Sequence, residues 1–331
     1  MRLLGGAAGV GLVPTNFACD VAGGARVVSS TFVPTPDEPL TPTAQFYINY
    51  NFGLPELPVP TAWRLAVRGM VEHELSLSLD DLLAFEQVTR EITLECVGND
   101  PGGGLISSGA FTGVPVRAVM ERAGLDPHGR GIRFLGLDGY PSYLPVEVAR
   151  NDDALLVHAL NGEPLPVQYG APVRVLFPGR FGMFSTKWLD SITVARSYHT
   201  YGALSGLGSP IDGETRVRSR IDGPRDGRTV TLGETVAITG LAVTPGLGVP
   251  RVEVRMGGAW REAELTFNRV GDGRSPFLWT LWRIEWTPRE PGVHVLSVRA
   301  YDTRGETQSF EADFPYDSSA IHSVRVVVDG S

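Results

Sequence analysis

The sequence is poor in cysteine, in long apolar runs and in excess positive charge. Its two cysteines, Cys19 and Cys96, stand in very different sequence contexts, so no disulfide framework is expected. No apolar run reaches the roughly 20 residues that a membrane-spanning helix needs, so we expect a chain that does not span a membrane. The formal net charge of −8 provides no basic surface, which argues against nucleic acid as a partner.

The composition is typical of a globular protein rich in turns and strands. Apolar residues make up 42% and charged residues 20% of the chain, which excludes a disordered or fibrous protein. The 40 glycines and 25 prolines favour many turns. A length of 331 residues is long for a single core and favours two domains.

The first 26 residues are interpreted as the remnant of an export signal. Residues 1–13 read MRLLGGAAGVGLV, which resembles the tail of a twin-arginine signal that has lost its arginine pair. This interpretation predicts a periplasmic or extracellular protein. A frayed terminus remains the alternative, and Cys19 is either a poorly matching lipidation site or an ordinary free thiol.

Residues 27–213 predict a mixed α+β domain. We expect a strand over 64–69, and then a short helix in which Ser78 and Asp81 form a capping box. The alternating pattern of residues 91–96 predicts a strand that ends at Cys96. Pro115 can open the next helix and Gly124 can end it. Apolar segments follow without a strict βαβ rhythm, which favours α+β over a doubly wound sheet.

Residues 214–331 predict an all-β domain. Alternating runs such as TVAITGLAV and VHVLSVRAY are separated by turn residues, as in a β-sandwich. Trp282, Ile284 and Trp286 should share one sheet face and lie in the core. The Gly- and Ser-rich residues 198–213 are expected to connect the two domains.

The motifs resemble one known family in that family's own order. The segments LECVGN, GAFTGVPVRAVMERAG, GLDGY, NGEPLPVQYGAPVRVLFPGRFG and TKWLDSI resemble the molybdopterin domain of the sulfite oxidase family. The C-terminal runs RVEVRMGGAWREAEL, WTLWRIEW and VHVLSVRAYD resemble the immunoglobulin-like domain that follows it in that family. The resemblance implies a molybdenum-cofactor oxidoreductase with an immunoglobulin-like β-sandwich after the catalytic domain.

The resemblance makes Cys96 the thiolate ligand of the metal. Taken alone, a cysteine at a strand end is more often inert packing. A molybdenum ion held by dithiolene sulfurs, however, accepts a further soft anionic ligand, and a nearby metal cation deprotonates a thiol. A serine hydroxyl is hard and poorly ionised, so it should not replace Cys96.

The resemblance also implies a set of residues around the pterin. Such a heterocycle needs hydrogen-bonding partners and, at its phosphate end, cations and backbone N–H groups. Without the family, Arg174 and Lys187 would be read as ordinary surface charges. The residues implied as cofactor-binding, besides Cys96, are Ile48, Asn49, Tyr50, Asn51, Phe52, Asp138, Tyr169, Arg174, Ser185, Thr186 and Lys187.

Several positions depart from the family pattern. Asn49 stands where the family has an arginine, and Asp100-Pro101 replaces two arginines after the cysteine motif. These changes weaken the case for a doubly charged oxyanion as substrate. Tyr169 lies near the place of a pterin-contacting histidine. Tyr198 and Tyr201 are candidates for the catalytic tyrosine, with Tyr201 the better fit, although either could be a packed loop aromatic.

These observations predict an enzyme that transfers an oxygen atom to or from a small oxo-compound, with Cys96, Asn49 and Tyr201 as catalytic residues. No CxxCH motif is present and the six histidines are scattered, so no haem is expected and electrons should pass to an external carrier such as a cytochrome. The alternatives are a sulfite dehydrogenase, a sulfoxide-type reductase and a cofactor-free extracellular binding protein. A homodimer formed through the β domain is a further expectation.

Overall fold

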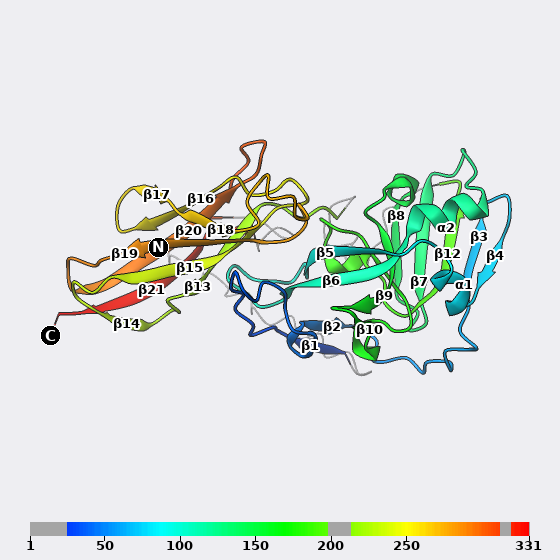
Figure 1. The fold of residues 1–331 in the computed structure, drawn as a ribbon, viewed down its shortest axis with the longest axis horizontal. Coiled ribbons are helices and arrows are strands. Elements are labelled where there is room, and N and C mark those ends of the chain that lie inside the picture. Colours follow the sequence, from blue (N-terminus) through cyan, green and yellow to red (C-terminus); the bar gives the residue numbers. More distant parts are fainter. Residues whose placement is uncertain (1–24, 198–212, 312–318, 331) are drawn as a thin grey trace, which may run out of the picture.

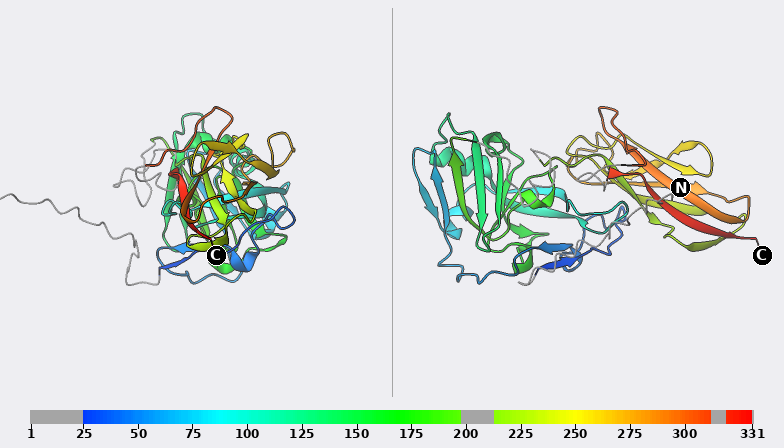
Figure 2. Two further views of the ribbon diagram at one scale, coloured as in Figure 1. Left: turned by 90° about the vertical axis from the view of Figure 1, so that its left-hand side faces the viewer. Right: turned by 180° about the vertical axis from the view of Figure 1, so that it is seen from behind.

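The computed structural model describes residues 25–197, 213–311 and 319–330 of the chain. Its strands form two groups that share no sheet. Figure 1 shows the two groups as neighbouring bodies along the long axis, with β5 and β6 reaching from one body toward the other. The same arrangement is seen from behind in Figure 2.

The first group holds the strand that leads to Cys96. Its five-stranded sheet runs in the order β10-β9-β6-β5, with β11 paired to β9. A separate two-stranded sheet, β1-β2, covers residues from the irregular N-terminal part. The bounds are β1 Arg26–Val28, β2 Ile48–Tyr50, β5 Val88–Glu95, β6 Ile106–Pro115, β9 Leu155–Leu160, β10 Glu163–Pro164 and β11 Arg174–Leu176.

A second five-stranded sheet of this group has the order β4-β3-β12-β7-β8. In it β3 and β12 run parallel, whereas the other pairs are antiparallel. The predicted strand over 64–69 is confirmed by β3. The bounds are β3 Leu65–Gly69, β4 Leu75–Leu77, β7 Gly131–Gly136, β8 Pro141–Pro145 and β12 Leu189–Ala195.

Two short α-helices lie where their capping residues predict them. In α1, Leu79–Leu83, the Ser78 hydroxyl accepts from the Asp81 N–H and the Asp81 carboxylate accepts from the Ser78 N–H, which is a complete capping box. In α2, Val116–Ala123, Pro115 precedes the first turn and Gly124 ends the helix with a φ of 69°. A left-handed φ favours glycine, so the predicted end of this helix is confirmed.

The group is more strand-rich than the α+β prediction stated. Among its described residues, the helical elements other than α1 and α2 are short 3-10 turns. The apolar segments form the strands β7, β9 and β11, of which β9 and β11 pair with each other and β7 belongs to the second sheet, and no long helix lies between them. The 3-10 turns are η1 Thr43–Gln45, η2 Val146–Arg150, η3 Val167–Tyr169 and η4 Gly182–Phe184.

The second group is a sandwich of two sheets, of orders β13-β15-β19-β18 and β14-β21-β20-β16-β17. A cluster of buried side chains from both sheets lies between them and includes Trp282 and Trp286, with Ile284 packed against it. The predicted core role of these three residues is confirmed. The bounds are β13 Arg218–Gly223, β14 Arg228–Thr231, β15 Val236–Val243, β16 Arg251–Met256, β17 Trp260–Glu262, β18 Glu264–Phe267, β19 Thr280–Trp286, β20 Gly292–Tyr301 and β21 His322–Asp329.

Another apolar cluster joins the two groups. It combines Ile106 of β6 with Leu241, Leu278 and Trp279 from the sandwich. Trp279 is 1% exposed, and its indole N–H donates to the backbone carbonyl of Pro39 at 2.8 Å. The two bodies are therefore fastened by a dry contact next to the strands that frame Cys96.

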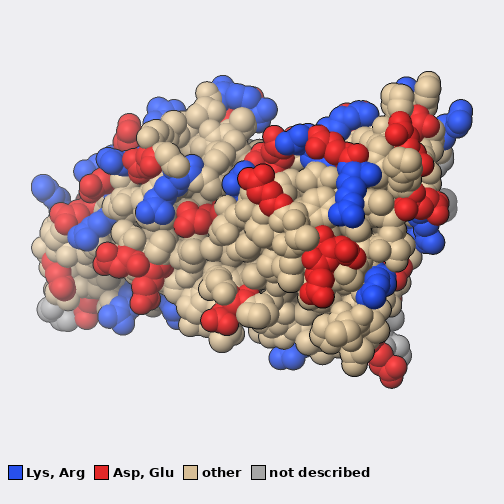
Figure 3. All heavy atoms as spheres, turned by 45° about the vertical axis from the view of Figure 1, so that its right-hand side comes forward, with Lys and Arg blue, Asp and Glu red and all other residues tan. Residues whose placement is uncertain are grey.

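Charged side chains of both signs lie interspersed on the face drawn in Figure 3, so this face has no uniformly basic region. In the part of the chain that the structure describes, no helix has both the length and the apolar character for crossing a bilayer.

Candidate active site around Cys96

Cys96 lies at the point where β5 ends. Its backbone N–H donates to the Leu105 carbonyl at 3.0 Å, and its carbonyl accepts from the Asn99 N–H at 3.1 Å. The first bond continues the β5–β6 pairing, and the second closes a turn. The side chain is 8% exposed. The predicted strand end at Cys96 is therefore confirmed, and the sulfur lies at the rim of a buried cluster.

The sulfur of Cys96 has polar neighbours. The Asn49 side-chain amide donates to Sγ at 3.1 Å, from strand β2. Burial raises the pKa of the thiol, whereas a hydrogen bond from the Gly98 backbone, the bond from Asn49 and the charge of Lys187 oppose that rise. Without a bound cation the thiol therefore keeps its proton, and its surroundings are arranged to favour the thiolate once a cation is present.

Lys187 is the only lysine of the sequence. Its ammonium donates to the backbone carbonyls of Asn49, at 2.9 Å, and of Gln168, at 3.2 Å. It also lies 5.6 Å from the ring centres of Tyr50 and Trp188. Burial, together with the nearby charge of a buried arginine, lowers the pKa of Lys187 to about 7, and an anion bound beside it would favour the charged form.

Asp138 and Tyr140 lie in the turn after β7. One Asp138 carboxylate oxygen accepts from the Tyr140 N–H at 3.0 Å. Burial raises the pKa of Asp138, and the charge of Lys187 acts against this rise. Burial also raises the pKa of Tyr140 well above its ordinary value, and the charges of Cys96 and Asp138 raise it further. These charges therefore lie within electrostatic reach of one another.

Arg174 is fully enclosed. Its guanidinium donates to the carbonyls of Tyr169 and Ser185, at 3.1 and 2.9 Å, and its Nε has no partner. Burial lowers the pKa of Arg174 to about 10, so it stays charged at neutral pH. Two of its donors hold the chain, and the unpaired Nε is available to a bound group.

Three predicted cofactor residues have side chains already engaged in the protein. The Tyr169 hydroxyl donates to the carbonyls of Thr43 and Phe46, at 2.9 and 3.0 Å, so its proton anchors the N-terminal segment. Ser185 accepts from a backbone N–H, and its own N–H donates to the Gly182 carbonyl. Thr186 is bonded through its hydroxyl to another buried side-chain hydroxyl. These three side chains are therefore part of the protein's own hydrogen-bond network.

The segment Ile48 to Phe52 is only partly buried. Ile48 and Tyr50 are buried, whereas Asn51 and Phe52 are exposed. The Phe52 ring lies 6.2 Å from the ring of Tyr140. Asn49 thus faces the sulfur, and Phe52 presents an exposed ring beside Tyr140.

Tyr47 was not predicted as a site residue. Burial raises the pKa of its phenol strongly, and the charge of Cys96 raises it further, whereas Arg174 acts in the opposite direction. Its position in the aromatic cluster just before Asn49 was the only sequence signal. The predicted catalytic Tyr201, and Tyr198 with it, lie outside the described residues.

The residues present fit a molybdenum–pterin group. The unpartnered Nε of Arg174 and the unpartnered side-chain amide of Asn99 are buried donors. Lys187 is a partly buried cation, and Cys96 supplies a soft sulfur. Among the described residues, no three His, Cys, Asp or Glu side chains gather to hold a metal. Cys96 is thus the metal donor that this cluster offers.

Comparisons with known proteins agree with this chemistry. A family model described as "Oxidoreductase molybdopterin binding domain" matches residues 52–201, which include Cys96, Asp138 and Lys187. Human mitochondrial sulfite oxidase is 32% identical over 303 residues, covering 78% of this chain and 55% of that protein. Chicken sulfite oxidase is 30% identical over 315 residues, covering 81% of this chain and 68% of that protein.

The fold has a counterpart among solved structures. The sulfane dehydrogenase SoxCD from Paracoccus pantotrophus aligns with a TM-score of 0.74 at 20% identity, covering 98% of this chain and 96% of that one. The chain belongs to the sulfite oxidase family of molybdopterin oxidoreductases. It spans about half the length of the mammalian sulfite oxidases that it matches.

Proposed function

We propose that this protein transfers an oxygen atom to or from a small oxo-compound and exchanges electrons with an external carrier. The observation that carries the proposal is the cluster of Cys96, Asn49 and Lys187, in which a buried sulfur faces an amide donor and lies within reach of a cation. Family membership supplies the cofactor class, and the cluster supplies a place where its metal can bind.

The chain's own residues have separable tasks in this proposal. When bound, the molybdenum cofactor supplies two-electron redox chemistry and the exchange of oxygen with water. Cys96 holds the metal through its sulfur. The Asn49 amide directs that sulfur and stabilises its negative charge through a hydrogen bond. Lys187 and the Nε of Arg174 would supply cationic donors to the pterin, and the Asp138 carboxylate would supply an acceptor.

The site favours a substrate of low charge. At the position where the family carries an arginine, Asn49 is neutral, and it is committed to the Cys96 sulfur. Asp100, in the loop after Cys96, is exposed and adds negative charge nearby. Both features disfavour a doubly charged anion such as sulfite, so we infer a neutral oxo-compound such as a sulfoxide. Sulfite dehydrogenation is the alternative, suggested by the sulfite oxidases among the relatives.

Two measurements test the proposal. Elemental analysis of protein made in a cofactor-competent host should give close to one molybdenum per chain, and Cys96→Ser should abolish turnover with the fold retained. Loss of Cys19, as Cys19→Ser, is the matched control and should change neither. A protein without molybdenum under these conditions would instead be the cofactor-free binding protein. Faster turnover with sulfite than with sulfoxides would refute the substrate inference.

The remaining features of the proposal follow from the sequence. We infer a cytochrome-type electron carrier, no haem in the chain, export to the periplasm or beyond, and a homodimer formed through an immunoglobulin-like sandwich. The division into residues 1–26, 27–213 and 214–331 is part of the same proposal. Residues 1–24 and 198–212 lie outside the described part of the chain. N-terminal sequencing of the exported protein and light scattering test the location and the dimer.

A further inference from the structure

The loop that follows Cys96 has little of its own to hold it. Residues 97–105 read VGNDPGGGL, so four of the nine are glycine. Glycine gives a chain more conformational freedom than any other residue, and Gly102 has a left-handed φ of 78°. Within the loop, the Asn99 side chain accepts from the Leu105 N–H and the Asp100 carbonyl accepts from the Gly103 N–H, both at 2.8 Å. The remaining support has to come from outside.

Part of that support comes from the first body, where the Ser30 N–H donates to the Gly104 carbonyl at 2.8 Å, and the rest comes from the sandwich. Arg220 of β13 donates to the Gly103 carbonyl at 3.0 Å, and its Nε is held by Asp222 at 2.7 Å. The His322 ring of β21 fills the space beside Gly102 that a side chain there would need. His322 is itself fixed, because its Nδ1 accepts from the Ile221 N–H at 3.0 Å. Two strands of the sandwich thus hold the glycine part of the loop.

A second contact holds the end of β5. Glu95, which directly precedes Cys96, forms an ion pair with Arg218 of β13. Both residues are buried, at 3% and 1% exposure. Burial lowers the pKa of Arg218 to about 9, so it still carries its charge at neutral pH. Because neighbouring side chains of a strand point to opposite faces, Arg218 holds the strand end from the side away from the sulfur.

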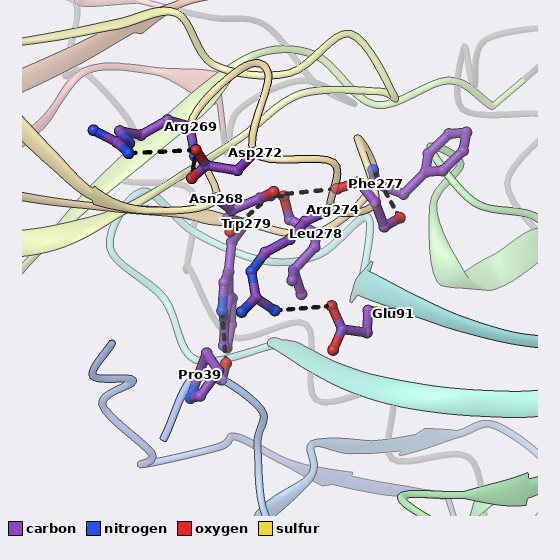
Figure 4. A network of polar contacts seen from close by, with 10 residues as sticks. Pro39, Glu91, Asn268, Arg269, Asp272, Arg274, Phe277, Leu278 and Trp279 are labelled. Atoms are coloured by element: carbon purple, nitrogen blue, oxygen red, sulfur yellow. Dashed lines mark hydrogen bonds and ion pairs between the residues drawn. The ribbon is translucent and has the colours of Figure 1, made fainter. Parts of the chain in front are cut away.

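The sandwich also contacts β5 farther from Cys96. The Thr93 N–H donates to the Phe277 carbonyl and the Trp279 N–H donates to the Thr93 hydroxyl, both at 2.9 Å. Arg274 lies 3.6 Å from Glu91, and Figure 4 shows this pair beside Trp279 and Pro39. The Arg274–Glu91 pair joins the same two bodies along the same strand, but it lies four positions before Glu95. Its side chains are 45% and 31% exposed, so it provides a comparison with a more exposed pair that contacts the same strand.

We propose that Arg218 and Arg220 of the β-sandwich are positioning residues for Cys96. Arg218 fixes the strand end on one side of the cysteine and Arg220 fixes the loop on the other, so the sulfur is held at its place before any metal binds. The proposal rests on the proposed function, since it assumes that Cys96 is the metal ligand. The sandwich is then a part of the active-site support in addition to any role in assembly.

The test is the reactivity of the Cys96 thiol in metal-free protein. Arg218→Met removes the charge but keeps the length of the side chain, and Arg274→Met is the control at the more exposed ion pair that contacts the same strand, β5. Alkylation of Cys96 by iodoacetamide is followed on its own peptide by mass spectrometry, which separates it from Cys19. Hydrogen exchange of residues 97–105 is measured beside that of β20, which reports whether the sandwich stays folded.

Arg218→Met should accelerate both alkylation and loop exchange by about tenfold or more, because a buried ion pair is lost and the loop opens locally. Arg218→Lys should restore most of the protection, and Arg274→Met should leave both rates within about twofold of the parent protein. In molybdenum-loaded protein, Arg218→Met should change the electron paramagnetic resonance signal of the reduced metal and lower kcat more than it raises KM.

Unchanged alkylation and loop exchange in Arg218→Met would overturn the proposal, as would an equal acceleration in Arg274→Met. If Arg218→Met fails to fold, the double variant Arg220→Met/Asp222→Asn is used in its place, because it leaves no unpaired buried charge. Its rates of Cys96 alkylation and of loop exchange then test the proposal in the same way. Thiol reactivity and hydrogen exchange are measured without metal. They can therefore contradict the positioning role of Arg218 while molybdenum analysis still supports the proposed function. The two proposals can therefore be separated.

Discussion

The lysine at the site gives a prediction whose size can be worked out. Burial lowers the pKa of Lys187 from 10.5 to about 7. One pKa unit corresponds to about 1.4 kcal/mol, so the folded chain disfavours the charged form by about 5 kcal/mol relative to the unfolded chain. Arg174 adds to this effect, whereas Asp138 and Cys96 oppose it.

The direction of the pH dependence follows from the proton balance. Between pH 7 and pH 10.5 the unfolded chain binds a proton at Lys187 that the folded chain has released, so the free energy of unfolding rises with pH. Below pH 7 both states are protonated and the full cost is present. Lys187→Met, which has no charge to bury, should therefore be more stable than the parent protein at pH 6, and this advantage should shrink as the pH rises.

The assay uses the absence of any other lysine. In metal-free protein, an amine-specific reagent labels only Lys187 and the N-terminal amine, and peptide mapping separates the two. The rate of Lys187 labelling, plotted against pH, should have a midpoint near 7. The free energies of unfolding of the parent protein and of Lys187→Met, measured in urea, should approach each other as the pH rises. A midpoint near 10, or a stability difference that does not change with pH, would refute the reasoning.

Three further predictions concern neighbouring features. Trp279→Ala should cost about 3–5 kcal/mol in urea unfolding, because a fully buried indole is lost between the two bodies, and a loss below 1 kcal/mol would contradict a tight contact there. Gly124→Ala should cost about 1–2 kcal/mol, since its φ is 69° and a Cβ would lie 2.8 Å from Glu72, and an unchanged melting temperature would argue against this strain. Asn49→Leu removes the hydrogen bond to Sγ, so the pKa of Cys96 should rise and the alkylation profile of metal-free protein should move to higher pH; a shift to lower pH would contradict the assigned donor.

What the sequence determined by itself is local or carried by motifs. The capping box of Ser78 and Asp81 and the limits of α2 depend on residues a few positions apart, so they can be read directly. The alternation before Cys96 predicted a strand that ends there, because a period of two needs only the strand's own residues. The order of motifs was sufficient to name the family.

Only the tertiary structure decided which distant groups meet. The charge of Cys96 raises the pKa of Tyr47, the Tyr169 hydroxyl donates to backbone carbonyls, and Arg218 pairs with Glu95 of a strand far away in the sequence. The periodicity of the sequence does not predict such pairs, because they depend on how the sandwich docks on β5. They also depend on which buried donors must find a partner within the protein instead of water. The same docking makes the glycine-rich loop after Cys96 a held element, although its sequence alone indicates freedom.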